Sequence, residues 1–220
     1  MPFTTFSKIF KSKEDVLPEM PGTQTRVEVA EIVLDVIKNR RNVTKYQDRD
    51  VAQELIYDLL DAARHAHSEG NQQPWEFIIV RDKFIKQGLA EAALNQSWIA
   101  DAPVVIVACT NMRLASALYG ERGEKLYGIQ AVSAAIENLL IAAESFGLGT
   151  AWVGEFTERP VTVLITAPDY VRPAAIITLG WPAETPPQNM LQEIEEFTHV
   201  GNFGETMHKN RIEKERKAFP

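Results

Sequence analysis

Two adjacent arginines stand where the first helix of the chain is predicted to end. In "RRNVTKY", residues 40–46, Arg40 and Arg41 are followed by an amide, Asn42. The chain is acidic, with a net charge of -7, so a fixed double positive charge at one point needs a reason. One reason is that cations complement the helix C-terminal dipole, worth ~0.3–1 kcal/mol at a surface. The other is a binding role, which must be supported by the rest of the sequence.

Histidines and glycines give weaker evidence for other kinds of site. His65 and His67 are two residues apart at a predicted helix-to-loop junction, where their side chains diverge, so ordinary histidines are favoured over a metal chelate. A phosphate-binding glycine loop follows a strand and opens a helix. "GLGTAW", residues 147–152, follows a helix and opens a strand. This order argues against a Rossmann fingerprint or P-loop, and no nucleophile elbow stands out.

Composition indicates an ordinary globular protein. The chain has 220 residues, 45% of them apolar and 24% charged, and it has no long basic stripe, so no nucleic-acid partner is expected. We find no secretory signal and no run of ~18 apolar residues, which predicts a cytoplasmic protein without a membrane partner. The single cysteine, Cys109, lies in an apolar run and is predicted to be a buried, inert thiol.

The order of predicted elements indicates one domain of the α+β (mixed α/β) class. Residues 1–24 are read as an N-terminal arm and residues 25–220 as a single domain, with a C-terminal tail from about residue 195. Thr25 and Glu28 have capping-box spacing and start a helix that ends at Arg40, and Asp50 and Gln53 start a second helix in the same way. Further helices are predicted at 82–94 and 128–145, and strands at 77–80, 104–108, 150–153 and 173–179.

Four segments together resemble the signature blocks of the nitroreductase family of FMN-dependent oxidoreductases. They are "RRNVTKY", "SEGNQQPWEFIIV", "IQAVSAAIENLLIAAESFGLGTAWVGEF" and "IITLGWPAETPP", in the family's order, over about residues 27–190. The resemblance implies a mixed sheet flanked by helices in an intertwined homodimer. It also implies two FMN sites at the subunit interface.

The resemblance assigns cofactor-binding roles to three groups of residues. Arg40 and Arg41 match positions that reach the FMN phosphate and pyrimidine edge, with Asn42 hydrogen-bonding nearby. The second group is Ser68, Asn71 and Gln73, whose hydroxyl and amides would contact the phosphate and the ring edge, because amides both donate and accept. The third group is Val153, Gly154 and Glu155, which match a backbone segment that approaches flavin N5. For Gly154, a plain turn is the alternative to close backbone approach.

Three positions depart from the family pattern. Thr44 stands where a lysine or arginine is common, and His67 stands where proline is usual. Residues 182–199 contain no lysine or arginine, although a basic phosphate ligand often lies there. Arg211 is a candidate replacement, although its charged segment also fits a solvated helix face. The resemblance with these departures predicts weaker FMN binding or a differently built phosphate site.

The implied reaction is hydride transfer from NAD(P)H to flavin N5 and then to a small electron-poor acceptor, a nitroaromatic, quinone or enone. The chemistry belongs to the flavin, so no catalytic side chain is predicted. The alternatives are a flavin-binding or sensing protein with little turnover, or an oxygen-using or dehalogenating enzyme of the same fold. Residues 111–127 are predicted to be a solvated mobile segment, or else a lid through which Tyr119, Arg122, Lys125 and Tyr127 contact substrate.

Overall fold

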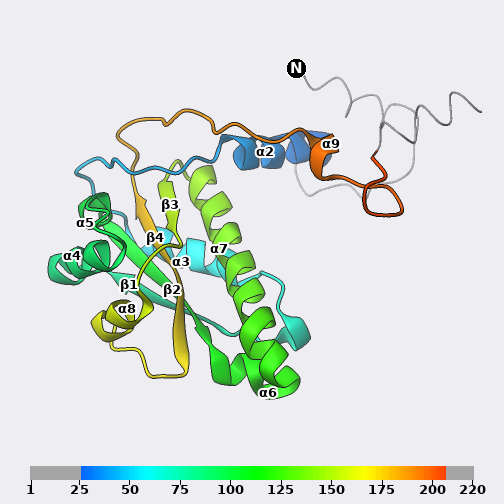
Figure 1. The fold of residues 1–220 in the computed structure, drawn as a ribbon. Coiled ribbons are helices and arrows are strands. Elements are labelled where there is room, and N and C mark those ends of the chain that lie inside the picture. Colours follow the sequence, from blue (N-terminus) through cyan, green and yellow to red (C-terminus); the bar gives the residue numbers. More distant parts are fainter. Residues whose placement is uncertain (1–25, 207–220) are drawn as a thin grey trace, which may run out of the picture. The chain divides into compact units, whose positions relative to one another are not determined.

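A computed structural model describes residues 26–206 of the chain (Figure 1). The helical elements are α2 Arg26–Asn39, α3 Gln53–Arg64, η1 Glu69–Asn71, α4 Lys83–Ala92, α5 Trp98–Asp101, α6 Met112–Arg122, η2 Gly123–Tyr127, α7 Gly128–Ser145, α8 Glu158–Leu164 and α9 Ile194–Phe197. The strands are β1 Trp75–Val80, β2 Val104–Asn111, β3 Gly149–Val153 and β4 Val171–Gly180. Every helix and strand predicted within this range is present, although their ends shift by a few residues.

The four strands form one sheet in the order β1-β2-β4-β3, and each neighbouring pair is antiparallel. The central strands β2 and β4 pair along almost their whole length. Among residues 26–206, the mixed character expected of the sheet is limited to one parallel bridge, between Asn42 and Thr150. The predicted α+β class is confirmed.

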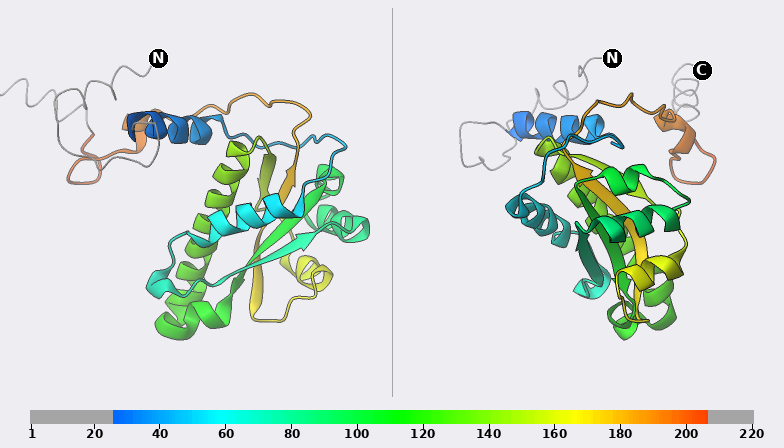
Figure 2. Two further views of the ribbon diagram at one scale, coloured as in Figure 1. Left: turned by 180° about the vertical axis from the view of Figure 1, so that it is seen from behind. Right: turned by 90° about the vertical axis from the view of Figure 1, so that its left-hand side faces the viewer.

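Helices cover both faces of the sheet, with α3 on one side and α4 and α8 on the other (Figure 2). Successive side chains of a strand point to opposite faces, so a strand buried on both sides reads as a continuous apolar run. In β2, Val104 and Ile106 belong to the core cluster with α3 and α7. Val105 and Val107 belong to the cluster with α4, α5 and α8. The run "VVIVAC" is therefore a central strand between two cores.

The helix α7 is the main support of the sheet. Eight of its 18 residues are buried, as its alanine-rich sequence predicted. Within the described range, α6, η2 and α7 make one helical stretch, Met112–Ser145, long and apolar enough by length and composition to cross a membrane. A core helix has the same composition, and the buried side chains of α7 contribute to the core beneath the sheet.

One local prediction is wrong. The second helix has Ala52 as its N-cap, without a side-chain cap, because the Asp50 carboxylate accepts from the backbone N–H of Val51 and pairs with Arg81 instead. Residues 111–127, expected to be a solvated mobile segment or else a lid, are helical and mostly exposed, and the Asn111 side chain caps α6 by accepting from Leu114 N at 3.2 Å; both alternatives stay predictions. The first capping box involves Thr25, which lies outside the described residues, as does the 1–24 arm.

The chain divides into two compact units, 1–186 and 187–220. In the described part of the second unit, α9 is followed by a turn in which Val200 N donates to Glu205 O at 2.7 Å and His199 bridges Thr206. The predicted tail boundary near residue 195 stays a prediction. All of the predicted FMN-binding residues lie in the first unit.

The thiol of Cys109 is fully buried in β2, and this burial raises its pKa to about 12. We expect the native protein to be inert toward an aromatic disulfide reagent near pH ~8, since the thiolate is the reactive form. One thiol per chain should react after unfolding in denaturant, measured by absorbance. A Ser145→Cys variant, with an exposed second thiol, is the control. Rapid reaction of native wild-type protein would contradict the burial.

Candidate functional site

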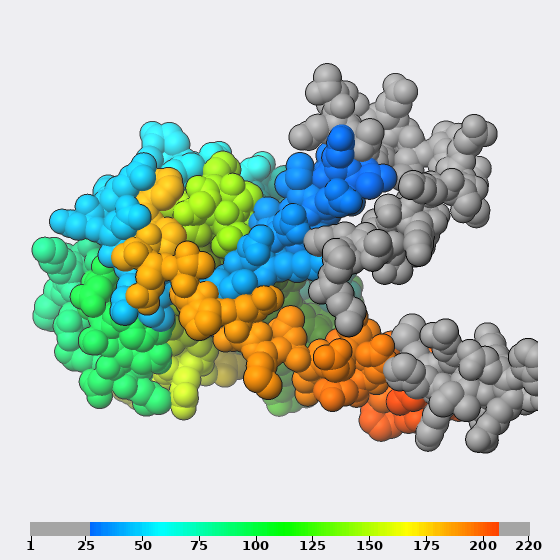
Figure 3. Space-filling model, turned by 90° about the horizontal axis from the view of Figure 1, so that it is seen from above, coloured from blue at the N-terminus to red at the C-terminus, as the bar shows by residue number. Residues whose placement is uncertain are grey.

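The segment that carries Arg40 and Arg41 is bonded to the edge of the sheet. Val43 N donates to Thr150 O at 2.9 Å, beside the Asn42–Thr150 bridge. A Cβ on Gly149 would lie 2.8 Å from the Val43 side chain, so glycine allows this close approach. Figure 3 shows the light-blue segment after α2 against the yellow-green atoms near residue 150. Positions 40–44 are thereby fixed along β3.

Tyr46 fixes the far end of the same segment. Its hydroxyl donates to Val43 O at 2.5 Å and contacts the Thr178 hydroxyl on β4 at 2.6 Å. Tyrosine has one hydroxyl proton, so Thr178 is the donor in the second contact. A Cβ on Gly180 would lie 2.7 Å from the Tyr46 ring. Burial raises the pKa of Tyr46, which therefore stays neutral and holds the segment against β4.

The two arginines have different surroundings. Arg40 Nη1 donates to Asn42 Oδ1 at 3.3 Å, and its Nε lies 3.7 Å from Glu137 on α7. Arg41 Nη1 donates to two backbone carbonyls at the end of α2, those of Lys38 at 2.6 Å and Arg40 at 3.0 Å. Arg41 thus satisfies the helix C-terminus, the alternative raised above, although its buried Nε has no hydrogen-bond partner in the described structure.

The second predicted group lies on a tight loop that includes η1. Ser68 is buried, and its hydroxyl accepts from Gln73 N at 3.1 Å. Asn71 and Gln73 both have positive φ, 55° and 49°, and both are exposed. Gln73 Nε2 contacts Asn71 Oδ1 at 3.3 Å. The loop therefore displays two preorganised amides, while the serine holds its backbone in place.

The third predicted group follows β3 directly. Val153 is the last residue of the strand and is buried, whereas Gly154 and Glu155 are exposed. The nearest atom to a Cβ on Gly154 would be Trp152 Nε1, at 3.6 Å. The backbone after β3 is therefore open to a planar ligand at close range.

The sheet separates the first and second groups. Thr150 lies opposite Leu179 on β4, whereas Trp75, just after the second group, aligns through Thr110 with Arg172. Seven residues of β4 span roughly 23 Å, and the three strand spacings between β1 and β3 add roughly 14 Å sideways. One chain therefore places these two groups at opposite corners, too far apart to hold the same phosphate or ring edge.

Sequence comparison agrees with the fold and the motif order. The family model described as Nitroreductase matches residues 37–98 and 83–181. The chain belongs to the nitroreductase family.

Relatives of this nitroreductase-family chain come from archaea and bacteria. One from Methanothermobacter thermautotrophicus, whose name includes "NAD(P)H nitroreductase", is 39% identical over 160 residues, 70% of this chain and 79% of the relative. An "FMN reductase [NAD(P)H]" of Bacillus subtilis is 31% identical, covering 69% and 66%. Among solved structures, NfrA2 of B. megaterium has a TM-score of 0.74 at 27% identity, covering 83% of this chain and 78% of that chain.

The positions that depart from the nitroreductase pattern lie as follows. Thr44 is half-buried, and the neighbouring Lys45 points to Glu184 at 3.0 Å, so it does not replace the missing cation at position 44. His67 is exposed, 3.4 Å from Glu69, whereas His65 lies 3.8 Å from Asp61. The two imidazoles face different carboxylates, as predicted. Arg211 lies outside the described residues.

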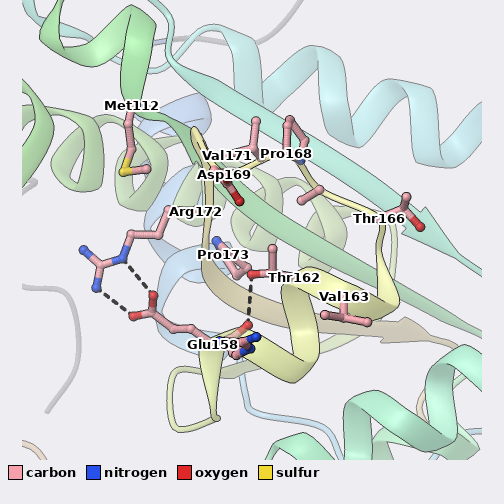
Figure 4. Close-up of a pocket in the computed structure, with 12 residues that line it drawn as sticks. Met112, Glu158, Thr162, Val163, Thr166, Pro168, Asp169, Val171, Arg172 and Pro173 are labelled. Atoms are coloured by element: carbon pink, nitrogen blue, oxygen red, sulfur yellow. Dashed lines mark hydrogen bonds and ion pairs between the residues drawn. The ribbon is translucent and has the colours of Figure 1, made fainter.

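A cleft of about 800 Å³ lies elsewhere in the described part of the chain (Figure 4). It is formed by α8 and the start of β4, and none of the predicted FMN-binding residues lines it. Its Arg172 and Glu158 bind each other through two hydrogen bonds, of 3.0 and 2.7 Å, so their charges are already matched. Volume alone does not locate the site.

Two supporting residues of the site were missed in the sequence. Glu137 faces Arg40 from α7. Tyr46, the last residue of "RRNVTKY", anchors that motif. The sequence feature that could have indicated Tyr46 is a polar aromatic residue six positions after Arg40. Its partner on β4, Thr178, depends on tertiary pairing and could not be predicted.

Replacing Tyr46 with phenylalanine should loosen the segment 40–46. The change leaves Val43 O and the buried Thr178 hydroxyl without their partner, so we expect a loss of ~1–3 kcal/mol in the free energy of unfolding. Urea unfolding measures this loss. Tyr57→Phe, at an exposed tyrosine, is the matched control and should change stability by less than ~0.5 kcal/mol. Equal stability of the two variants would contradict the anchoring role.

Proposed function

We propose that this chain is an NAD(P)H-dependent FMN oxidoreductase that transfers hydride through the flavin to a small electron-poor acceptor. The oxidoreductase class, the NAD(P)H donor and FMN follow from membership of the nitroreductase family and from relatives named NAD(P)H nitroreductase and FMN reductase. The hydride route and the acceptor class, a nitroaromatic, quinone or enone, belong to the proposal. The observation that carries it is the set of exposed, preorganised donors at the positions of the family motifs.

The residues present fit FMN. Arg40 keeps guanidinium N–H groups beyond those used by Asn42 and Glu137, and these suit a phosphate. The amides of Asn71 and Gln73 can donate and accept along an edge of alternating N–H and C=O groups. The backbone at Gly154 is open on its exposed side. These donors differ in kind because the phosphate, ring edge and N5 region of the cofactor differ in chemistry.

Bound FMN supplies the two-electron chemistry, accepting and giving hydride at N5. The chain contributes positioning: Tyr46 and Gly149 hold the Arg40 segment, and Ser68 holds the amide loop. Thr44 offers no positive charge where the family often has one. Neutral donors and Arg40 would therefore have to stabilise negative charge on the flavin ring. We therefore assign the side chains to binding and orientation.

We also propose a homodimer, because α2 leaves an apolar face open. Ile32, Val33 and Ile37 are each about half exposed, at 50%, 48% and 45%. Val36 and Ile141 help to line an apolar groove of about 360 Å³ between α2, α3 and α7. Apolar side chains grouped on one helix face indicate an interaction surface. A second copy of the chain is the occupant that family resemblance supports.

A dimer also resolves the separation of the site. A twofold axis can bring the Arg40 corner of one chain beside the Asn71 corner of its partner, and symmetry then produces two equivalent composite sites. In this proposal each FMN contacts Arg40, Asn42 and Gly154 of one chain. Ser68, Asn71 and Gln73 are contributed by the other chain.

A spectroscopic titration tests the proposed activity. We expect the purified protein to bind FMN, and the bound flavin to lose its visible absorbance when NADH or NADPH is added without oxygen. Reoxidation by a quinone should sustain nicotinamide oxidation above the rate with free FMN. Binding without turnover would support the alternative of a flavin-binding or sensing protein. No FMN binding would overturn the proposal.

Mixing two variants with weakened FMN binding tests the composite site. Arg40→Ala and Asn71→Ala should each bind FMN at least tenfold more weakly, because each loses charge-assisted or amide contacts. Co-refolding equal amounts should restore about a quarter of the high-affinity sites, since half of the dimers are mixed and each has one intact site. FMN fluorescence quenching measures this fraction. Arg40→Ala mixed with Gly154→Val, two changes within one corner, is the control and should restore none.

A further inference from the structure

A second polar cleft, of about 690 Å³, lies between the segment after Tyr46 and the helices α4 and α5. It is lined largely by charged and amide side chains: Gln47, Asp48, Arg49, Asp50, Arg81, Lys83, Lys86, Gln87 and Asp101. None of the residues predicted to bind FMN is among them. The lining has four cations and three carboxylates, a local positive excess in a chain whose net charge is -7.

Lys86 is the unusual group in this cleft. It is only 6% exposed, and its Nζ donates to Ala102 O at 2.6 Å. No carboxylate of the described residues lies within ion-pair distance of it, and an ammonium has three protons to donate. Burial lowers the pKa of Lys86 and repulsion from Lys83 lowers it further, with Asp101 acting in the opposite direction.

A structural role explains part of this arrangement. Through its bond to Ala102, Lys86 caps the end of the short helix α5 and joins it to α4. One carbonyl, however, satisfies one of three ammonium protons, and a neutral donor could do the same without the cost of burying a charge. Asp101 offsets part of this cost from within the chain, and an anion from outside the chain can offset more of it.

Three further cations, Arg49, Arg81 and Lys83, line the same cleft. Arg81 is already engaged by Asp50 and by Val51 O. Lys83 is exposed and forms no ion pair within the described chain, and the Arg49 guanidinium lies 3.7 Å from the centre of the Trp181 ring. Stacking engages the face of a guanidinium and leaves its N–H edges free to donate. Arg49, Lys83 and Lys86 therefore remain as donors around one polar space.

We propose that this cleft binds a small molecule carrying a phosphate monoester, with Lys86, Lys83 and Arg49 as the phosphate ligands. A phosphate has several terminal oxygens that can accept from two ammonium groups and one guanidinium at once. The amides of Gln47 and Gln87 suit the hydroxyl groups of an attached sugar. The cleft volume falls within the range of ~300–1,000 Å³ typical of small-molecule sites. Tyr46 lines this cleft and also supports the Arg40 segment, but none of the residues predicted to bind FMN lines the cleft, and the proposal does not rest on FMN binding.

Calorimetric titration with AMP tests this site in FMN-saturated protein, so that the proposed FMN phosphate site is filled. We expect saturable binding of one AMP per chain, competition by inorganic phosphate, and no binding of adenosine. Lys83→Gln and Arg49→Gln should each weaken AMP about tenfold or more, through loss of a charge-assisted contact. Lys125→Gln is the matched control, because it removes the same charge from an exposed lysine and should leave AMP affinity unchanged.

Lys86→Met tests the buried ligand and should abolish AMP binding. Because this change can unfold α5, the exposed variants Lys83→Gln and Arg49→Gln decide the proposal if Lys86→Met is unstable. AMP binding that persists unchanged in both exposed variants, or no saturable AMP binding at all, would overturn it. If the chain binds no FMN, AMP is titrated into Arg40→Gln protein, in which the other proposed phosphate contact is removed. Failure of the FMN proposal therefore does not affect this test.

Discussion

The pairing of β2 with β4 is the interaction on which the rest of the structure depends. These strands run antiparallel in register from Val104 opposite Leu179 to Asn111 opposite Val171, with one irregularity between Ala108 and Cys109. Their side chains are buried on both faces, so each face requires its own helical layer. On one face α3 and α7 provide this layer, and on the other α4, α5 and α8 do so. The loops that carry the polar site residues are therefore confined to the ends and edge of the sheet.

This arrangement explains why the motifs that are proposed to bind one cofactor are distant within one chain. An antiparallel sheet of long strands has two ends, and the "RRNVTKY" segment is bonded near one of them through Thr150. The loop at 68–73 leads into Trp75 at the other end. A family motif shows which residue types meet a cofactor, but not from which copy of the chain they come. The apolar face of α2 lies near the Arg40 segment in sequence. The proposed dimer would therefore cover this face and complete the site at the same time.

Periodicity and capping rules predicted most of the fold from sequence, because apolar runs and an alanine-rich helix are determined by local pattern. The exception has a tertiary cause. Asp50 does not cap its helix since Arg81, distant in sequence, competes for its carboxylate. For the segment 111–127 the sequence predicted solvent exposure but not a helix, which begins at the local Asn111 cap and continues into α7. At the candidate site, the resemblance predicted cofactor-binding roles for Arg40, Asn71 and Gly154, and these stay predictions, whereas the contacts of Glu137 and Tyr46 became evident only from the fold.

The ion pair between Arg40 and Glu137 has a consequence for cofactor affinity. A phosphate that approaches Arg40 also meets the Glu137 carboxylate, whose repulsion offsets part of the attraction because the two charges lie close together. Arg41 Nη1 already donates to two carbonyls at the end of α2. Lys45 is held by Glu184. The fixed positive charge in "RRNVTKY" is thus largely engaged by the chain itself. In the proposed dimer, the energy for holding a dianionic phosphate comes from neutral donors and from the second chain, so this proposal makes cofactor binding and dimer formation two parts of one equilibrium.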